Sequence, residues 1–163
     1  MKIKVQRASL EDKAAVMSIL SRTGFFRANE LEIAEEVFDD AVTKGPEGDY
    51  QSFVAREEEH NTIGWVCFGP TPCTIGTFDV YWLAVDPQHQ NRGVGSFLMQ
   101  YAADFIENLK GRMIVVETSG NPRYQITRRF YEKTGYHRAA SLKDFYADGD
   151  DKIIYVKYLR EPI

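Results

Sequence analysis

The segment 78–101 constrains the fold more than any other part of the chain. It reads FDVYWLAVDPQHQNRGVGSFLMQY. The β-branched, aromatic and apolar residues at its start predict a buried strand over Phe78–Val85. Asp86-Pro87 ends that strand, because proline cannot donate a ladder hydrogen bond. Apolar residues then recur at helical spacing, which predicts a helix over Ser96–Leu109.

Glycines between this strand and helix predict an anion site. The turn Gln90–Gly95 contains Gly93 and Gly95, and glycine lets the backbone approach a ligand closely. The helix that follows presents free N–H groups with positive dipole character, which suit a phosphate or a pyrophosphate. A tight turn without any ligand is an equally open alternative. A dinucleotide fingerprint would need a third glycine where Leu98 stands, and no Gly-Lys-Ser/Thr of a P-loop follows.

In the rest of the chain, predicted strands alternate with predicted helices. This order predicts an α/β (α+β) fold in a single domain over residues 1–163. Neither an internal repeat nor a linker divides it. The predicted strands lie at 1–7, 51–57, 62–69, 113–118, 136–140 and 152–159, and the predicted helices at 9–22, 28–43 and 124–133. Residues 141–151 are predicted to be the loop that joins the last two strands.

Composition narrows the functions that the chain can have. Its 20 basic and 24 acidic residues give a net charge of −4, which argues against nucleic-acid binding, where a basic face is expected. No apolar run is long enough to span a bilayer and no apolar signal segment opens the sequence, so we expect a cytoplasmic protein without a membrane partner. Cys67 and Cys73 are predicted to be buried free thiols, and no metal site is predicted.

Two motifs resemble those of the GNAT superfamily of acetyl-CoA-dependent N-acetyltransferases. The first is a strand ending in Val-x-Pro, here Val85-Asp86-Pro87, followed by Gln/Arg-x-x-Gly-x-Gly/Ala, here Gln90-Asn91-Arg92-Gly93-Val94-Gly95. The second is Phe-Tyr-x-x-x-Gly-Phe/Tyr, here Phe130-Tyr131-Glu132-Lys133-Thr134-Gly135-Tyr136. The order of the predicted elements is similar to that of the family across nearly the whole chain.

The resemblance implies the GNAT fold, a central mixed and mostly antiparallel sheet that splays between two central strands and is flanked by helices. It implies acetyl-CoA as cosubstrate. The strand before the loop would bulge, and its exposed backbone groups would bind the pantetheine arm and polarise the thioester, at Leu83, Ala84 and Val85. Amides of the loop and of the helix start would bind the pyrophosphate, at Gln90, Asn91, Arg92, Gly93, Val94, Gly95 and Ser96.

One departure from the family concerns a cofactor-binding asparagine. The family usually has this residue seven positions before the catalytic tyrosine, where this chain has Tyr124. The nearest asparagine is Asn121. Either a longer loop lets Asn121 reach the cofactor, or the contact is lost.

The same resemblance supplies candidates for proton transfer. Tyr131 stands where the family places the acid that protonates the departing thiolate. Asp79 and Glu117 occupy positions that resemble those of the base in different members, and a water chain is the third candidate. Asp is disfavoured inside a strand, so Asp79 needs a reason to be there. Because side chains alternate along a strand, Asp79, Tyr81 and Leu83 are expected to share one face, which borders the splay.

Acceptor-binding residues are expected in two loops and beside the splay. The loop between the first two helices contributes Phe25 and Phe26, and the closing hairpin contributes Phe145 and Tyr146, next to clustered acids. Aromatic rings and acids together can hold an ammonium group, and Tyr81 borders the same place. A solvated acidic turn is the alternative for the hairpin.

The sequence thus predicts an N-acetyltransferase that moves an acetyl group from acetyl-CoA to a primary amine by direct attack. The acceptor is either a small amine or amino acid, or a peptide N-terminus. A module that binds or senses acetyl-CoA without catalysis is the main alternative, and a nucleotide-dependent oxidoreductase is disfavoured by the incomplete glycine fingerprint. A homodimer is compatible with the family.

Overall fold

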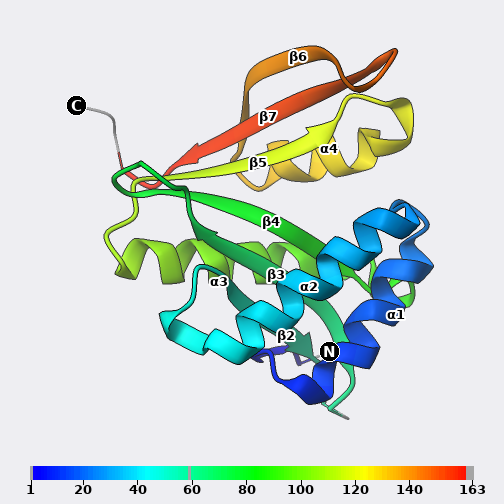
Figure 1. The fold of residues 1–163 in the computed structure, drawn as a ribbon, viewed down its shortest axis with the longest axis vertical. Coiled ribbons are helices and arrows are strands. Elements are labelled where there is room, and N and C mark those ends of the chain that lie inside the picture. The colour runs from blue at the N-terminus through cyan, green and yellow to red at the C-terminus, as the bar shows by residue number, and fades with distance from the viewer. Residues whose placement is uncertain (1, 59, 161–163) are drawn as a thin grey trace.

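The computed structural model describes residues 2–58 and 60–160. A seven-stranded sheet in the order β1-β2-β3-β4-β5-β7-β6 forms its centre (Figure 1). Its strands are β1 Lys4–Arg7, β2 Gln51–Arg56, β3 Thr62–Pro70, β4 Thr77–Val85, β5 Met113–Ser119, β6 His137–Ala147 and β7 Asp150–Tyr158. The helices are α1 Lys13–Thr23, α2 Ala28–Lys44, α3 Val94–Asn108 and α4 Gln125–Lys133, with short 3-10 turns η1 Leu10–Asp12, η2 Gly45–Glu47, η3 Pro87–His89 and η4 Pro122–Tyr124.

The sheet forks between β4 and β5. These two strands run parallel and pair only from Thr77–Val80 to Met113–Val116, whereas every other neighbouring pair of strands is antiparallel. Beyond Val80 and Val116 the two strands diverge, as Figure 1 shows. The predicted mixed, mostly antiparallel and splayed sheet is therefore confirmed.

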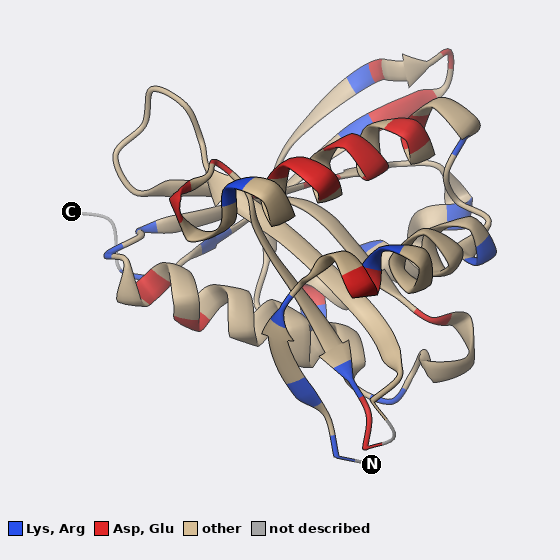
Figure 2. Cartoon of the chain, turned by 60° about the horizontal axis from the view of Figure 1, so that its bottom comes forward, with Lys and Arg blue, Asp and Glu red and all other residues tan. Residues whose placement is uncertain are grey.

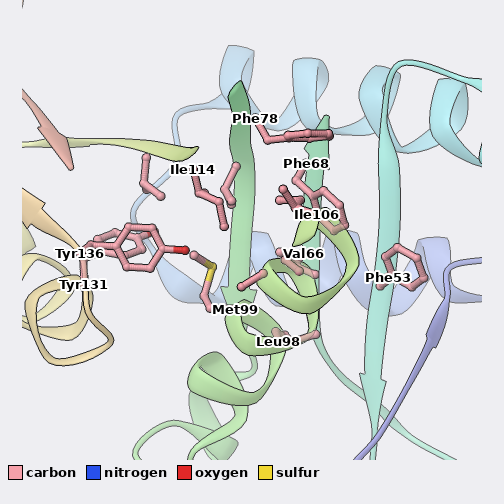
Figure 3. Close-up of a cluster of buried hydrophobic side chains, with 14 of the residues drawn as sticks. Phe53, Val66, Phe68, Phe78, Leu98, Met99, Ile106, Ile114, Tyr131 and Tyr136 are labelled. Atoms are coloured by element: carbon pink, nitrogen blue, oxygen red, sulfur yellow. The ribbon is translucent and has the colours of Figure 1, made fainter. Parts of the chain in front are cut away.

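Two hydrophobic clusters cover the two faces of the sheet. The first cluster joins the sheet to α3 and α4 through residues such as Phe68, Leu98 and Tyr131, and Figure 3 shows part of it. The second joins the opposite face to α1 and α2, where Trp65 packs against Phe38 with ring centroids 5.8 Å apart. Helices on both faces bury the central strands, which explains their continuous apolar sequences.

β4 contains a bulge, and beyond it each side chain points to the opposite face from the one that a regular strand would give it. Cys67 pairs with Trp82 and Phe68 with Val80, so Tyr81 has no partner on β3. Val80 therefore packs in the first cluster, whereas Ala84 packs in the second. An inserted residue shifts the period of two by one position, and the fork opens at the same place.

The closing hairpin differs from the prediction. Residues 141–151 were expected to form a loop, but β6 extends to Ala147 and β7 begins at Asp150, so only Asp148 and Gly149 turn the chain. Gly149 adopts the left-handed φ of 77° that such a turn requires. β6 is exposed along its whole length, and an exposed strand does not need the apolar alternation on which the prediction relied.

Other boundaries move by a few residues. α3 begins at Val94 rather than at Ser96, and a 3-10 turn precedes both α1 and α4. The predicted strand over residues 1–7 is confirmed from Lys4 to Arg7, and Met1 lies outside the described residues. Cys67 is buried as expected, but Cys73 is exposed.

Most charged residues are exposed or partly exposed, and Figure 2 shows acidic residues along α2. None of the helices in the described ranges combines the length and the apolar character needed to cross a bilayer. Within those same ranges, no group of three or more His, Cys, Asp and Glu side chains is placed to hold a metal ion.

A buried carboxylate ties the first turn of the chain to the β2–β3 hairpin. The Asp12 side chain is fully buried, and its Oδ1 accepts hydrogen bonds from Arg56 Nη2 at 2.6 Å and Thr62 Oγ1 at 2.8 Å. Its Oδ2 accepts from the backbone N–H of Ser9 at 2.9 Å. Burial makes the loss of one partner costly, because the other charge is left without compensation.

We therefore expect Asp12→Asn to lower the free energy of unfolding by about 3 kcal/mol or more. Urea denaturation of the purified protein measures this change. Glu11→Gln is the matched control, since Glu11 is exposed and its replacement should stay within about 0.5 kcal/mol of the parent. Equal stability of the two variants would contradict a stabilising role for the buried pair.

Candidate active site

A cleft of about 680 Å³ lies in the fork of the sheet. β4 and β5 form its two sides, and the α1–α2 loop, the η4 turn, α4 and the closing hairpin complete it. It brings together twelve of the predicted site residues from distant parts of the chain: Phe25, Phe26, Asp79, Tyr81, Leu83, Ala84, Val85, Gln90, Glu117, Asn121, Tyr131 and Tyr146.

The remaining predicted residues lie outside this lining. Residues 91–95 form the turn and the helix start beyond Gln90, and Ser96 lines a separate hollow. Phe145 is about half exposed and does not line the cleft. Its ring packs against Tyr146 and lies under the ammonium group of Lys152, at 4.1 Å from Nζ to the ring centroid.

The start of α3 offers backbone N–H groups without an internal acceptor. Gly93 precedes the helix with φ of 83° and Asn91 has φ of 62°, so both need the left-handed region that glycine and asparagine tolerate best. No side chain caps this helix, which leaves the first-turn amides of Val94, Gly95 and Ser96 free. A Cβ on Gly93 would meet no atom within 4 Å, so the space beside this residue is open.

Gly95 connects the two sequence motifs in space. A Cβ at this position would lie 3.3 Å from the Phe130 ring and 3.6 Å from Val85. The glycine thus lets α4 pack closely on the start of α3, and it brings Tyr131, the neighbour of Phe130, to the cleft. Gly64 of β3 likewise lets α3 pack closely on the sheet, because a Cβ there would meet Leu98 at 2.9 Å and Val94 at 3.1 Å.

A smaller hollow of about 390 Å³ lies beside the start of α3, next to the C-terminal end of α4. Two lysines, Lys133 and Lys157, line this hollow. The other lining residues are Ser96, Met99, Gln100, Thr134, Gly135 and Tyr136. The Tyr136 hydroxyl is buried and has no hydrogen-bond partner among the described residues. Burial raises the pKa of Tyr136, so the phenol stays protonated at neutral pH.

An ion pair holds the end of β4 where the turn begins. Arg22 at the end of α1 donates to both carboxylate oxygens of Asp86, at 2.8 and 3.3 Å. The hydrogen bond from Arg22 is the main cause that lowers the pKa of Asp86, which also accepts from the backbone N–H of Gln88. His89 follows, with Nε2 at 3.3 Å from Glu57. The turn is thus fixed to α1 and to the β2–β3 hairpin.

Tyr131 presents a buried phenol to the cleft. Its side chain is only 6% exposed and packs against Phe130, Tyr136 and Tyr155. Burial raises the pKa of Tyr131, which keeps the hydroxyl protonated at neutral pH. No described residue hydrogen-bonds to that hydroxyl, although the residue lines the cleft.

The two candidate bases face the α1–α2 side of the fork. Their neighbours Val80 and Val116 point into the first cluster, so Asp79 and Glu117 point the other way. Asp79 accepts a hydrogen bond from the Thr71 hydroxyl at 2.7 Å. Glu117 is half exposed and forms an ion pair with Lys152 at 2.8 Å. Asp79 thus has a neutral partner, whereas Glu117 has a cationic one.

The expectation that Asp79, Tyr81 and Leu83 share one face is wrong, because the bulge intervenes. Leu83 packs against the first cluster, on the opposite face from Asp79. Tyr81 stays at the cleft, 40% exposed, with its ring edge-on to Tyr50. Burial and the nearby Asp79 carboxylate raise the pKa of Tyr81 to about 12. The family resemblance implied a bulge in this strand, and the register places it at Tyr81.

Asn121 and Tyr124 both line the cleft. The Asn121 Oδ1 accepts from the backbone N–H of Arg123 at 3.1 Å, and its side-chain NH₂ donates to no described residue. Tyr124 donates to the carbonyl of Phe25 at 3.2 Å and packs against that ring at 5.0 Å. Its side chain therefore holds the α1–α2 loop, which leaves Asn121 as the better placed of the two to reach a ligand.

Sequence reasoning missed several residues of the cleft. Arg123 donates to the carbonyl of Gly24 at 2.7 Å and lies over the Phe25 ring at 5.1 Å, so it bridges the mouth of the fork. Trp82 and Glu30 also line the cleft, and of the clustered acids expected in the hairpin, Asp150 lines it. One available signal was the Asp148-Gly149 pair, which is typical of a two-residue hairpin turn and would have placed Asp150 at the start of a strand.

The comparisons with known proteins agree with this geometry. The family described as the acetyltransferase (GNAT) domain matches residues 48–138, more than half of the chain. A GNAT-family protein from Desulfovibrio desulfuricans has a similar structure, with a TM-score of 0.92 and 38% identity over 98% of this chain and 100% of that one. No curated protein sequence matches.

Two more distant structures share the fold. One is the ribosomal-protein-S18-alanine N-acetyltransferase from Escherichia coli, with a TM-score of 0.78 and 18% identity over 99% of this chain and 97% of that one. The other is YncA from Salmonella typhimurium with its cofactor acetyl-CoA, with a TM-score of 0.77 and 17% identity over 100% and 97%. From the family match and the Desulfovibrio relative together, the chain belongs to the GNAT acetyltransferase family.

Proposed function

We propose that this acetyltransferase moves an acetyl group from acetyl-CoA to a primary amine by direct attack. The observation that carries the proposal is the convergence in one cleft of the Tyr131 hydroxyl, the free edge of β4 and the carboxylates of Asp79 and Glu117. The acceptor is either a small amine or the N-terminal amine of a peptide. The N-acetyltransferase from Escherichia coli, which shares the fold, supports an amine acceptor.

The fork suits a long ligand such as acetyl-CoA. Leu83, Ala84 and Val85 pair with β3 on one edge only, so their other edge would bind the pantetheine arm as an added strand would. The pyrophosphate would lie on the free amides of Val94, Gly95 and Ser96. Lys133, in the neighbouring hollow, would meet the remaining phosphate. YncA, which has its cofactor acetyl-CoA bound, shares this fold.

Transfer needs a neutral amine, whereas an alkylamine with a pKa of about 10 is mostly protonated at neutral pH. A base removes that proton, and the amine nitrogen then attacks the thioester carbonyl carbon. An amide N–H at the free edge of β4 stabilises the oxyanion. The carbon–sulfur bond then breaks, and the Tyr131 hydroxyl gives its proton to the departing thiolate. The nitrogen releases the extra proton that it carries after the attack, and this proton restores the Tyr131 hydroxyl. The products are the acetylated amine and free CoA.

Asp79 is the better placed of the two candidate bases. Its partner is the neutral Thr71 hydroxyl, so its charge is available to an incoming ammonium. Glu117 must first loosen its contact with Lys152. A water chain that ends at either carboxylate remains compatible with the same cleft.

Tyr131→Phe is expected to lower kcat by about 100-fold, because loss of a general acid typically costs about 10²–10⁴-fold. Acetyl-CoA binding should persist, since the ring that packs in the core is kept. Stopped assays of CoA release measure kcat, and calorimetry measures binding. Tyr101→Phe is the matched control, because Tyr101 packs against Phe53 and does not line the cleft. Unchanged turnover in Tyr131→Phe would exclude the acid role.

Asp79→Asn and Glu117→Gln separate the two candidate bases. A rate–pH profile of kcat/KM for the parent should rise with pH as the base loses its proton. We expect Asp79→Asn to remove the rising limb and to lower the rate at neutral pH by about 100-fold. Glu117→Gln should keep the shape of the profile. If neither change alters the profile, a water chain replaces the carboxylate in this account.

A further inference from the structure

The closing hairpin contains four aspartates, and only one of them lines the cleft. Asp144 accepts from the backbone N–H of Gly149 at 2.8 Å, and Asp151 accepts from the backbone N–H of Asp144 at 2.9 Å, so both build the turn. Asp148 is exposed in the turn itself. Asp150 instead lines the cleft together with Tyr146. The acidic character of the hairpin reaches the cleft through Asp150 alone.

Asp150 is held by a neutral partner at the end of β5. The buried hydroxyl of Ser119 donates to its Oδ1, and that hydroxyl also accepts from the backbone N–H of Asn121 at 2.9 Å. Ser119 is therefore fixed on both sides, and it fixes the carboxylate in turn. No cationic side chain pairs with Asp150 among the described residues, so a cationic ligand would meet no competing partner at this carboxylate.

Two tyrosines stand close to Asp150. Burial raises the pKa of Tyr146 to about 12, and the carboxylates of Glu117 and Asp150 add to this effect. Burial also raises the pKa of Tyr124, where Glu30 and Asp150 contribute in the same direction. These carboxylates thus act on both phenol rings. Aromatic faces beside an unpaired carboxylate are what a desolvated cation needs.

Charge across the cleft favours a cation over an anion. Four carboxylates line it, at Glu30, Asp79, Glu117 and Asp150, against the guanidinium groups of Arg27 and Arg123. Arg123 is already committed to the Gly24 carbonyl and the Phe25 ring. Of the four carboxylates, Glu117 has a cationic partner in the described structure. The cleft also contains the unpartnered Tyr131 hydroxyl, an independent sign that a ligand belongs there.

We propose that Asp150 binds a second positive group on the acceptor, at a distance from the amine that is acetylated. Ser119 lies two residues beyond Glu117 on the same face of β5, which places their side chains about 7 Å apart along the strand. An amine near Asp79 and Glu117 therefore leaves a second ammonium of a short diamine beside Asp150, between Tyr124 and Tyr146. This inference rests on the proposed amine acetylation.

Three acceptors test this assignment on the unaltered protein: 1,4-diaminobutane, pentylamine and 5-aminopentanoate. They share one primary amine and its chain, and they end in an ammonium, a methyl and a carboxylate group respectively. With saturating acetyl-CoA, kcat/KM should be at least about 10-fold higher for the diamine than for pentylamine, because a charge-assisted contact in a desolvated site is worth about that much. Equal values, or a preference for 5-aminopentanoate, would overturn the assignment.

Variants locate the effect at Asp150. Asp150→Asn should remove the preference for the diamine, so that the ratio of kcat/KM for diamine and pentylamine falls from about 10 to about 1. Asp151→Asn, with the same change of charge one residue away and outside the cleft lining, should keep the preference. A loss in Asp150→Asn that is equal for diamine and pentylamine would contradict a contact with the second ammonium.

Binding separates this inference from the proposed function. Calorimetry with CoA present measures 1,4-diaminobutane binding to the parent and to Asp150→Asn, whether or not acetyl transfer occurs. Binding that weakens about 10-fold in the variant supports the contact, even if no amine is acetylated. The absence of acetylation would overturn only the proposed function. No binding to the parent protein would overturn the contact itself.

Discussion

β4 and β5 pair at their beginnings and then part, and each strand end is held by a different helix. Arg22 at the end of α1 grips Asp86, the residue that follows β4. Arg128 of α4 donates to the carbonyls of Ser119 and Asn121, at 2.8 and 2.9 Å, where β5 ends. Strands that closed on each other would satisfy their own backbone groups and leave no edge for a ligand. Each of the two arginines thus holds one of the diverging strand ends.

The bulge at Tyr81 determines to which face of the sheet the later side chains of β4 point. After the bulge, the Leu83 side chain points toward the first cluster and the Ala84 side chain toward the second. Before the bulge, the Asp79 side chain points away from the first cluster. One strand thus presents a carboxylate to the proposed acceptor side and a free backbone edge to the proposed cofactor. A regular strand would have placed the Asp79 and Leu83 side chains on a single face. Bulges often occur next to functional sites for this reason.

Much of the site could be predicted because its signals are local. Glycines at the start of α3 need a left-handed backbone or a close approach, and Gly93 and Gly95 show one of these each. Tyr131 follows from a motif of the same local kind. The Arg123 bridge and the Ser119–Asp150 pair depend on contacts between segments far apart in the sequence. No pattern within one segment carries such information, which is why these features emerge only from the structure.

The central claim is that acetyl-CoA lies along the free edge of β4 and ends on the start of α3. Hydrogen exchange of backbone amides, measured with and without saturating CoA, tests it most directly. The account predicts slower exchange at residues 83–85 and 93–96, and unchanged exchange in β1 and at the N-terminal half of α2. If CoA saturates the protein while these amides exchange as before, the cofactor lies elsewhere and the account is contradicted.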